Sequence, residues 1–572
     1  MSNAFESTGK NAKAPFSLRV HRGDGMALLA MNWKTEKPPL DFVGFGIEFR
    51  PPGSEKFQNV LNRINFPNPD GTVSGERRKS LEAPIQKFRW VNFPATKIPP
   101  GEFTYRVTAM FMDGDGKLRA GGVQSASIEL SRETCPGQMN VTYTRGFIAS
   151  QAFVNQFDLT GDGVKQLFPS KGPMGLEFTP THPKAKAAYE WMGFEARGAI
   201  LELLDQAISV DQQAQVRVVA YDLNQPEIVE RLEKLGDRLK IIIDDSGEHV
   251  EDDSAESKAA QRLVKSAGKN HVKRQHLGQL QHNKTIIVDG SKIKAAIGGS
   301  TNFTWRGMYV QNNHAVVVQG ESAIAPFLTA FEQYWSSDKV ADFGASEAAI
   351  WTDFGFQKLD ARVSFSPHSQ NNALLQEIAD DILTTQSSLF YSLAFLYQTK
   401  GPIREAIEDV TNRDGVFVYG VSDKKVGGLQ LLKPDGNLAP VRPESLSKNV
   451  PEPFKSEPTG GGGNRMHHKF VVIDFGLPSA RVYFGSYNFS STADTKNGEN
   501  LFCVRDRRVA VSFAVEALRI FDHYHFRVTQ AESSAARKQI ALQRPPSQPG
   551  EAAWWEPFYS DPVKIRDREL FS

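Results

Sequence analysis

The fold of this chain is decided by the stretch HHKFVVID at residues 467–474, which is followed by GSYN at residues 485–488. Its apolar run predicts a buried strand. Because a strand alternates its faces, His467 and Lys469 project to the same side. An imidazole can act as a nucleophile or a general acid, and an ammonium group can hold a phosphate oxygen. This pair of side chains therefore suits phosphodiester chemistry.

The same pattern occurs a second time, earlier in the chain. Residues 282–289 read HNKTIIVD and residues 298–302 read GGSTN, so the His-x-Lys-x4-Asp spacing and the following Ser and Asn are both repeated. A single His-x-Lys pair at a strand edge is weak evidence, but two coincident long patterns are far more informative. The repeat predicts a duplicated unit.

This repeated motif resembles that of the phospholipase D superfamily, which includes phospholipases D, cardiolipin synthases, and related endonucleases and phosphodiesterases. The resemblance implies that the two motifs meet across a pseudo-two-fold interface in one active site. One histidine would attack phosphorus to give a covalent phosphohistidine. The other would protonate the leaving oxygen and then deprotonate water or another alcohol. The resemblance implies neither a metal nor a cofactor.

The candidate site residues come from both copies of the motif. The predicted catalytic residues are His282, Lys284, Asp289, Asn302, His467, Lys469, Asp474, Asn488 and Glu499, and the predicted substrate-binding residues are Ser300 and Ser486. The lysines and asparagines would orient and neutralise the non-bridging phosphate oxygens. The two aspartates end the motif strands, where we expect them to orient the assembly or to form structural salt bridges.

The two copies differ at one position that concerns the roles of the histidines. Glu499 stands where the resembled family often has a carboxylate that orients a histidine, whereas the first copy has Asn313, followed by His314. Precedent in single-chain relatives favours His282 as the nucleophile, and this is our prediction. Glu499 supports the alternative, because a carboxylate in the second half would make His467 the more basic imidazole.

Length, charge and cysteine content set the class of protein. A chain of 572 residues with a net charge of +1 is too long for one core, and its charge favours neither nucleic acid nor an anionic membrane. Cys135 and Cys503 are too few for a disulfide framework, which fits a reducing compartment. The N-terminus has no apolar core of the signal type, and no run of about 18 apolar residues occurs. We expect a cytoplasmic monomer without a transmembrane segment, able to contact a membrane peripherally.

The predicted organisation is multidomain. Residues 1–14 are a flexible leader, and residues 15–133 are an all-β sandwich that resembles a fibronectin type III-like module. Residues 134–350 and 351–572 are two phospholipase D-like α/β repeats related by pseudo-two-fold symmetry. The predicted sandwich strands are 16–20, 26–33, 42–50, 87–93, 103–112 and 124–130.

The two repeats show the same order of helices and strands. We expect strands 175–180 and 362–367, each ending at a proline, to be equivalent. The other predicted strands are 216–221, 239–244, 294–298, 315–318, 388–395, 416–421, 480–484 and 501–504. The predicted helices are 184–208, 226–235, 323–335, 373–385, 402–411 and 511–529, and the span 246–276 is a helix plus loop. Residues 424–465, which end in four glycines before His467, are either a linker or a lid over the site.

Three functions remain open at the level of sequence. A phospholipid phosphodiesterase is favoured by the single-chain size, the near-neutral charge and three aromatic residues near the motifs, Phe303, Trp305 and Tyr487. A nuclease acting on DNA or RNA is favoured by the text of residues 485–500, which looks much like the small bacterial nucleases of the superfamily, and by basic residues at 269–276. A non-catalytic binding protein is the third reading, although the histidines and lysines are intact in both copies. We favour the lipid reading slightly.

Overall fold

The computed structural model describes residues 5–93, 101–130, 133–159, 163–394, 396, 400–423, 429–432, 438–441, 466–535 and 539–572. The chain divides into two compact units. One consists of Met1–Arg132 with Val511–Ser572 and is called the sandwich unit below. The other is Glu133–Ala510 and is called the α/β unit.

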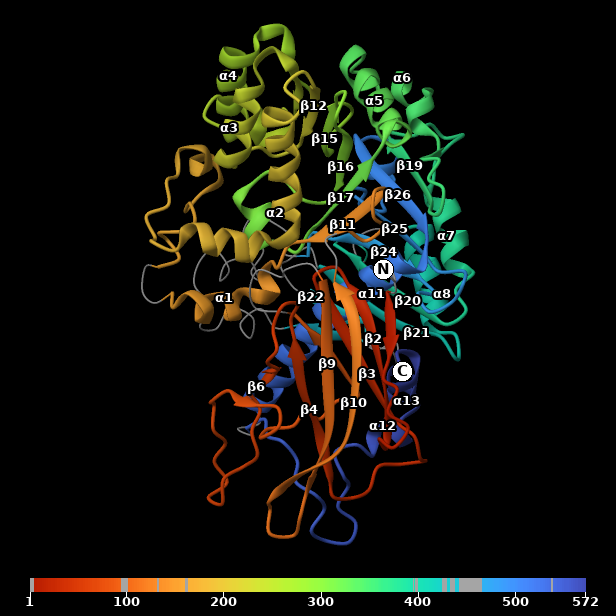
Figure 1. Ribbon diagram of the computed structural model, residues 1–572. Coiled ribbons are helices and arrows are strands. Elements are labelled where there is room, and N and C mark those ends of the chain that lie inside the picture. The colour runs from red at the N-terminus through yellow and green to blue at the C-terminus, as the bar shows by residue number, and fades with distance from the viewer. Residues whose placement is uncertain are drawn as a thin grey trace. The chain divides into compact units, whose positions relative to one another are not determined.

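The sandwich unit contains two four-stranded antiparallel sheets (Figure 1). The first has the order β1 (Glu6–Thr8), β2 (Phe16–Gly23), β3 (Met26–Trp33) and β8 (Arg89–Asn92), and the second has the order β10 (Leu118–Leu130), β9 (Gly101–Met112), β4 (Phe42–Arg50) and β5 (Gln58–Asn59). A two-stranded ribbon pairs β6 (Leu61–Asn62) with β7 (Arg78–Lys79). Residues of both sheets, such as Leu18 and Val107, enter one hydrophobic core. This agrees with the predicted all-β sandwich, and its likeness to fibronectin type III stays a prediction.

The C-terminal segment belongs to the sandwich unit, which differs from the predicted boundary of the second repeat. Its helices are α11 (Arg507–Ala535), which crosses the boundary between the units, α12 (Pro557–Ser560) and α13 (Pro562–Leu570). Trp554 and Trp555 are buried in the core of the sandwich, and Trp554 Nε1 donates a hydrogen bond to the Phe42 carbonyl at 2.9 Å. The buried Arg89 guanidinium reaches both Asp522 and Asp567 at 2.6 Å. Residues 511–572 therefore complete the sandwich.

The α/β unit is built on two mixed sheets. The first has the order β11 (Met139–Tyr143), β17 (His314–Gln319), β16 (Lys294–Gly299), β15 (Lys284–Asp289), β12 (Gln215–Ala220), β13 (Leu239–Ile243) and β14 (Val272–Arg274). The second has the order β18 (Thr352–Asp353), β19 (Asp360–Ser366), β26 (Glu499–Arg505), β25 (Arg481–Gly485), β24 (Lys469–Ile473), β20 (Ser388–Leu393), β21 (Phe417–Asp423), β22 (Leu429–Leu432) and β23 (Leu438–Val441).

The strand orders reveal the duplication. The series β11, β17, β16, β15, β12 and β13 corresponds in order to β19, β26, β25, β24, β20 and β21. In both series the last pair is parallel and every other neighbouring pair is antiparallel. Each motif strand, β15 or β24, lies in the middle of its series. The predicted duplicated α/β fold is therefore present.

One predicted equivalence is wrong. Residues 175–180 are not a strand, because Gly172–Glu177 forms the 3-10 helix η2 and the chain then runs on irregularly to Pro180. The true counterpart of β19 is β11, since each pairs antiparallel with the strand that follows the second half of its motif. The residues between β11 and α2 are an elaboration of the first half. The shared ending at a proline was thus a coincidence.

The described helices of the α/β unit comprise those that the apolar periodicity predicts and three short ones that it does not, at 150–157, 340–344 and 491–495. They are α1 (Ser150–Phe157), α2 (Ala185–Ser209), α3 (Pro226–Leu235), α4 (Ala255–Ala267), α5 (Glu321–Ser336), α6 (Val340–Gly344), α7 (Leu375–Leu383), α8 (Pro402–Thr411) and α10 (Ser491–Thr495). Helix α3 is one of those predicted: Pro226 starts it, and Ile228, Leu232 and Leu235 line its buried face at helical spacing. Helix α2 is interrupted at Phe194, where φ is 44°.

The proposed lid falls mostly outside the described residues. Of residues 424–465, the structure describes only the short strands β22 and β23, which extend the second sheet, and the four glycines at 460–463 are not among them. Within the described part of the chain, no helix is both long enough and apolar enough to cross a membrane.

Candidate active site

The two motif histidines face each other in the α/β unit. His282 and His467 each lie two residues before a motif strand, β15 or β24. Their ring centroids are 6.3 Å apart and the ring planes are inclined by 63°. Both side chains are almost buried, with 5% and 6% of their surface exposed. At this separation both rings can contact a single phosphoryl group.

The Nδ1 atom of each histidine is bonded to a fixed acceptor. His282 Nδ1 lies 2.7 Å from Glu499 Oε2, and His467 Nδ1 lies 2.8 Å from Asn313 Oδ1 and 3.0 Å from the Ser300 carbonyl. An acceptor at Nδ1 holds the proton there and orients the ring. In the neutral imidazoles the lone pair is therefore on Nε2.

These contacts cross between the two halves and correct one sequence argument. Glu499, in the second half, bonds to His282 of the first half and not to His467. Its counterpart Asn313, in the first half, serves His467 of the second half. The position of the carboxylate thus favours His282 as the nucleophile, in agreement with the prediction. The argument that Glu499 makes His467 the more basic imidazole no longer holds.

Burial and charge set the protonation of the histidines. Burial lowers the pKa of His282 below its usual value, and the carboxylate of Glu499 offsets part of this effect. Burial and then the Lys469 ammonium hold the pKa of His467 well below its usual value, and the groups that its Nδ1 contacts among the described residues are neutral. In the free protein near pH 7, His282 is therefore a neutral imidazole with a lone pair on Nε2.

The motif lysines lie beside the histidines. Lys469 Nζ donates a hydrogen bond to the His467 carbonyl at 2.8 Å, and Lys284 Nζ donates one to the His282 carbonyl. Lys284 Nζ also lies 4.7 Å from the centroid of the Tyr221 ring. Burial lowers the pKa of Lys284 to about 7, so this group binds a proton more readily when an anion enters the site.

The asparagine and serine side chains of the motifs differ in how many of their polar atoms are already hydrogen-bonded within the protein. Asn302 Nδ2 donates a hydrogen bond to Asp222, while Oδ1 of Asn302 and Oδ1 of Asn488 have no hydrogen-bond partner among the residues that the structure describes. Ser300 and Ser486 are fully buried. Ser300 Oγ bonds to Asn313 at 2.9 Å, and Ser486 Oγ accepts a hydrogen bond from the Asn500 backbone at 3.0 Å. A direct contact of either hydroxyl with phosphate would require these bonds to open, and it stays a prediction.

The motif aspartates have structural partners away from the histidines. Asp289 lies 3.0 Å from Lys294 on the neighbouring strand. Asp474 is buried and accepts hydrogen bonds from the backbone N–H groups of Gln386, Ser387 and Ser388 at 2.7 to 3.1 Å. Asp289 therefore forms the structural salt bridge that was one of its two predicted roles, and Asp474 fixes the entry to β20.

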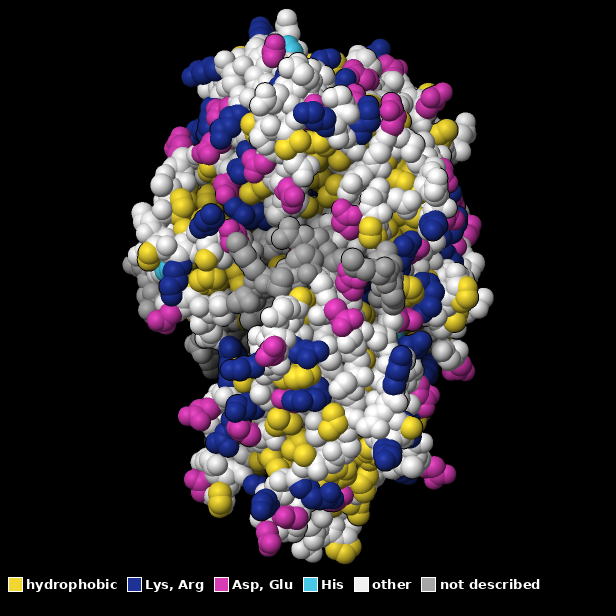
Figure 2. Space-filling model, in the orientation of Figure 1, with side chains coloured by type: hydrophobic (Ala, Val, Ile, Leu, Met, Phe, Trp, Pro, Cys, Tyr) yellow, Lys and Arg dark blue, Asp and Glu magenta, His cyan; other side chains and the backbone are white. Residues whose placement is uncertain are grey.

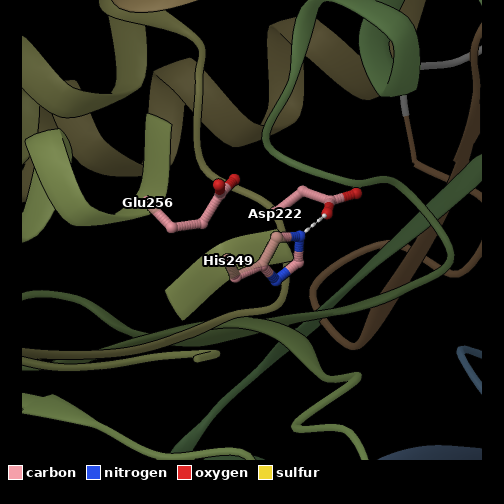
Figure 3. A group of neighbouring side chains, drawn as sticks. All are labelled: Asp222, His249 and Glu256. Atoms are coloured by element: carbon pink, nitrogen blue, oxygen red, sulfur yellow. Dashed lines mark ion pairs between the residues drawn. The ribbon is translucent and has the colours of Figure 1, made fainter. Parts of the chain in front are cut away.

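A second group of polar residues, which the motif search missed, lies behind the histidines. His249 Nδ1 lies 2.7 Å from Asp244 Oδ2, and its Nε2 lies 3.0 Å from Asp222 Oδ1 (Figure 3). The ring of Tyr221 lies between those of His249 and His282, at 4.9 and 4.7 Å. Tyr221, Asp222 and Asp244 directly follow the parallel strands β12 and β13. The signal in the sequence that could have revealed this group is the presence of polar residues directly after two buried strands.

The same group includes atoms suited to a cation. Asp222, His249 and Glu256 each offer one ligand atom, and these atoms lie within 4.8 Å of one another. However, both ring nitrogens of His249 already face carboxylates, and Glu256 Oε1 accepts a hydrogen bond from the Leu223 backbone at 2.9 Å. These contacts are complete without an ion, so we interpret the group as a hydrogen-bonded network.

The sequence of the α/β unit matches a known family. Residues 200–335 and 379–523 both match the model described as cardiolipin synthase, PLD-like domain, and each matched segment contains one His-x-Lys motif. A duplicated α/β fold in which each half brings a histidine and a lysine to one site defines a class of enzymes that act on phosphodiesters. This chain belongs to the phospholipase D superfamily.

The comparison with solved structures finds several matches to parts of this chain. Phosphatidylserine synthase from Haemophilus influenzae is 12% identical with a TM-score of 0.41, and the match covers 60% of this chain and 92% of that one. Nuc from Salmonella typhimurium, a phospholipase D family member, is 24% identical with a TM-score of 0.20 over 25% of this chain and 87% of that one. Polyphosphate kinase from Porphyromonas gingivalis is 12% identical with a TM-score of 0.34 over 54% of this chain, which spans only 42% of that one. None of the curated proteins matches this sequence.

Proposed function

We propose that this enzyme is a metal-independent phosphodiesterase that works through a covalent phosphohistidine on His282 and acts on phospholipids. The observation that carries the proposal is the arrangement of the two imidazoles. Their rings are 6.3 Å apart, and the Nδ1 atom of His282 is held by Glu499 at 2.7 Å. An oriented, neutral imidazole opposite a second one is what a two-step phosphoryl transfer requires.

The residues perform the two steps as follows. The lone pair of His282 Nε2 attacks phosphorus, the bond from phosphorus to the leaving alcohol breaks, and His467 Nε2 gives its proton to the leaving oxygen. In the second step His467 takes a proton from water or an acceptor alcohol, whose oxygen displaces His282. The bound phosphate anion favours the protonated form of His467 for the first step. Glu499 stabilises the positive charge that His282 carries as phosphohistidine.

Two observations support a lipid rather than a nucleic acid substrate. The matched family model is named for a cardiolipin synthase. Several basic residues at 269–276 also have partners within the protein: Lys273 reaches Asp338, Arg274 donates to the Asp244 carbonyl, and His276 reaches Asp245 at 2.8 Å. On the face shown in Figure 2, basic and acidic side chains are interspersed over the coloured residues. This pattern does not favour a long polyanion.

The aromatic residues near the motifs do not contribute to this choice. Phe303, Trp305 and Tyr487 are buried, with at most 5% of their surface exposed, so they pack in the interior rather than contact lipid. The ring of Tyr221 lies 4.7 Å from that of His282 and is only half-buried. It is the aromatic residue beside the reacting group.

The experiment compares substrates under one set of conditions with EDTA present. We expect release of choline from phosphatidylcholine vesicles and no degradation of plasmid or single-stranded DNA, and we expect His282→Ala and His467→Ala to abolish the release. Degradation of DNA without choline release would favour the nuclease. Absence of both activities would favour a binding protein.

A further inference from the structure

The bridge made by His249 is the strongest feature of the α/β unit that the proposed mechanism leaves unused. His249 lies in the 3-10 helix η4 (Gly247–Val250), outside both motifs. One ring nitrogen contacts the carboxylate of Asp244 at 2.7 Å, and the other contacts that of Asp222 at 3.0 Å; Figure 3 shows the second contact. Of its side-chain surface 16% is exposed. A bridging imidazole with a donor at each nitrogen can hold two carboxylates at a fixed separation.

Each of the two carboxylates also accepts a hydrogen bond from a group of the candidate active site. Asp222 accepts a hydrogen bond from Asn302 Nδ2, the predicted phosphate-orienting amide of the first motif. Asp244 Oδ1 accepts a hydrogen bond from the Gln281 backbone N–H at 2.7 Å, immediately before His282. His249 is therefore connected through Asp222 to the side-chain amide of Asn302, and through Asp244 to the backbone N–H of Gln281, which precedes His282.

The bridge is itself held in place by its surroundings. The His249 carbonyl accepts hydrogen bonds from Arg274 at 2.6 Å and from Ser254 at 2.9 Å, which fixes the backbone of η4. Glu256 holds the Leu223 N–H at 2.9 Å, next to Asp222. Burial by itself would lower the pKa of His249, but the bonds to Asp222 and Asp244 outweigh burial and raise this pKa to about 10. The ring therefore carries a proton on both nitrogens near neutral pH.

We infer that His249 is a positioning residue of this active site: by bridging Asp222 and Asp244 it fixes Asn302 and the backbone before His282 in the geometry that receives a phosphoryl group. The inference rests on the proposed function, because it assumes that a phosphate oxyanion occupies the space between His282 and His467. It assigns a catalytic consequence to a residue that contacts no substrate.

The test measures oxyanion binding in a double-mutant cycle. Calorimetry gives the dissociation constant of inorganic tungstate for the full-length protein and for His249→Ala, Asn302→Ala and the double variant. We expect His249→Ala to weaken binding about tenfold. We also expect the double variant to bind more tightly than the product of the two single effects predicts, since His249 acts partly through Asn302. Unchanged affinity in His249→Ala, or additive effects, would overturn the inference.

A matched control separates positioning from stability. His368 forms a buried pair with Asp494 at 2.7 Å in the second half. We expect His368→Ala and His249→Ala both to lower the melting temperature, but only His249→Ala to lose tungstate affinity and to regain it when imidazole is added. Equal loss of affinity in both variants would reduce His249 to a structural role.

Two further outcomes have defined meanings. If the wild-type protein carries one equivalent of a divalent metal that His249→Ala lacks, His249 Nε2 is a metal ligand and the inference is wrong. If tungstate binds as expected but neither phospholipid nor nucleic acid is cleaved, the proposed function fails while the positioning of the oxyanion site stands.

Discussion

Glu499 and Asn313 occupy equivalent positions in the two halves, yet each serves the histidine of the opposite half. This exchange makes the two imidazoles unequal. His282 has an anionic partner that stabilises its charged forms, whereas His467 has a neutral one. This asymmetry supports our proposal that His282 forms the covalent intermediate and His467 transfers the proton.

The carboxylate of Glu499 should matter more for rate than for binding. In Glu499→Gln we expect kcat to fall roughly 10²- to 10⁴-fold, the range of a misplaced general acid–base or nucleophilic group. Because Glu499 raises the pKa of His282, its removal should lower that pKa and move the acid limb of the kcat/KM profile to lower pH. A profile that moved to higher pH would contradict the pairing.

Lys284 should take up a proton when an oxyanion binds. Its pKa is lowered to about 7 by burial, so at pH 8 most free sites carry a neutral lysine, and a bound anion raises this pKa again. We expect tungstate affinity to fall as the pH rises from 7 to 9. Calorimetry in two buffers of different ionisation enthalpy should show proton uptake at pH 8. The uptake should disappear in Lys284→Met, and equal heats in both buffers for the wild type would refute it.

The residues of the site were predictable only as far as their pattern is local. The two members of each His-x-Lys pair are only two residues apart, with the lysine at the start of a strand, so spacing alone places His282 near Lys284 and His467 near Lys469. The partner of Glu499 depends on how the two halves meet, which no local pattern encodes. His249 carries no motif, and its role follows from two loops that approach each other only in the fold.

At the scale of elements, the strand order preserves the duplication while local details diverge. The sequence argument found the motif strands and most helices, because their apolar periodicity is strong. It failed at residues 175–180, where an apolar pair before a proline mimics a strand but η2 forms instead. Short apolar runs are ambiguous because tertiary contacts decide between helix, strand and loop.

Replacing the two motif aspartates with alanine should lower the free energy of unfolding by different amounts. Asp474 is buried and accepts three backbone N–H groups at the entry to β20, so Asp474→Ala should destabilise the protein by about 2–3 kcal/mol. Asp289 is partly exposed and pairs with Lys294, so Asp289→Ala should cost only about 0.5 kcal/mol. Urea unfolding would measure both, and a larger cost for Asp289 would contradict this account of the strand ends.

In the chain as a whole, residues 511–572 belong to the same unit as residues 1–132 and contribute to its hydrophobic core. The strand pattern of residues 15–133 predicted a self-contained sandwich, and the periodicity of 511–529 predicted a helix of the second repeat. Neither pattern could show that Trp554 and Trp555 fill the sandwich core. Contacts between residues so far apart in the chain leave no periodic trace.

The sandwich should therefore depend on Trp554. Removing this buried indole in Trp554→Ala should cost about 3–5 kcal/mol, because it leaves a cavity and an unpaired Phe42 carbonyl. Calorimetric unfolding should show a lower melting temperature for the sandwich unit. The half-buried Trp351 of the α/β unit provides the control, since Trp351→Ala should leave the sandwich transition in place. An unaffected sandwich in Trp554→Ala would show that 511–572 is dispensable.

The central claim is that His282 and His467 act on one phosphorus atom, with His282 forming the covalent bond. Intact-mass analysis after rapid acid-free quenching with a phospholipid substrate tests this most directly. With a phospholipid analogue whose leaving group departs without protonation, we expect an adduct of one phosphatidyl group that is absent in His282→Ala and accumulates in His467→Ala, because that variant lacks the base for the second step. An adduct that persists in His282→Ala and vanishes in His467→Ala would contradict it.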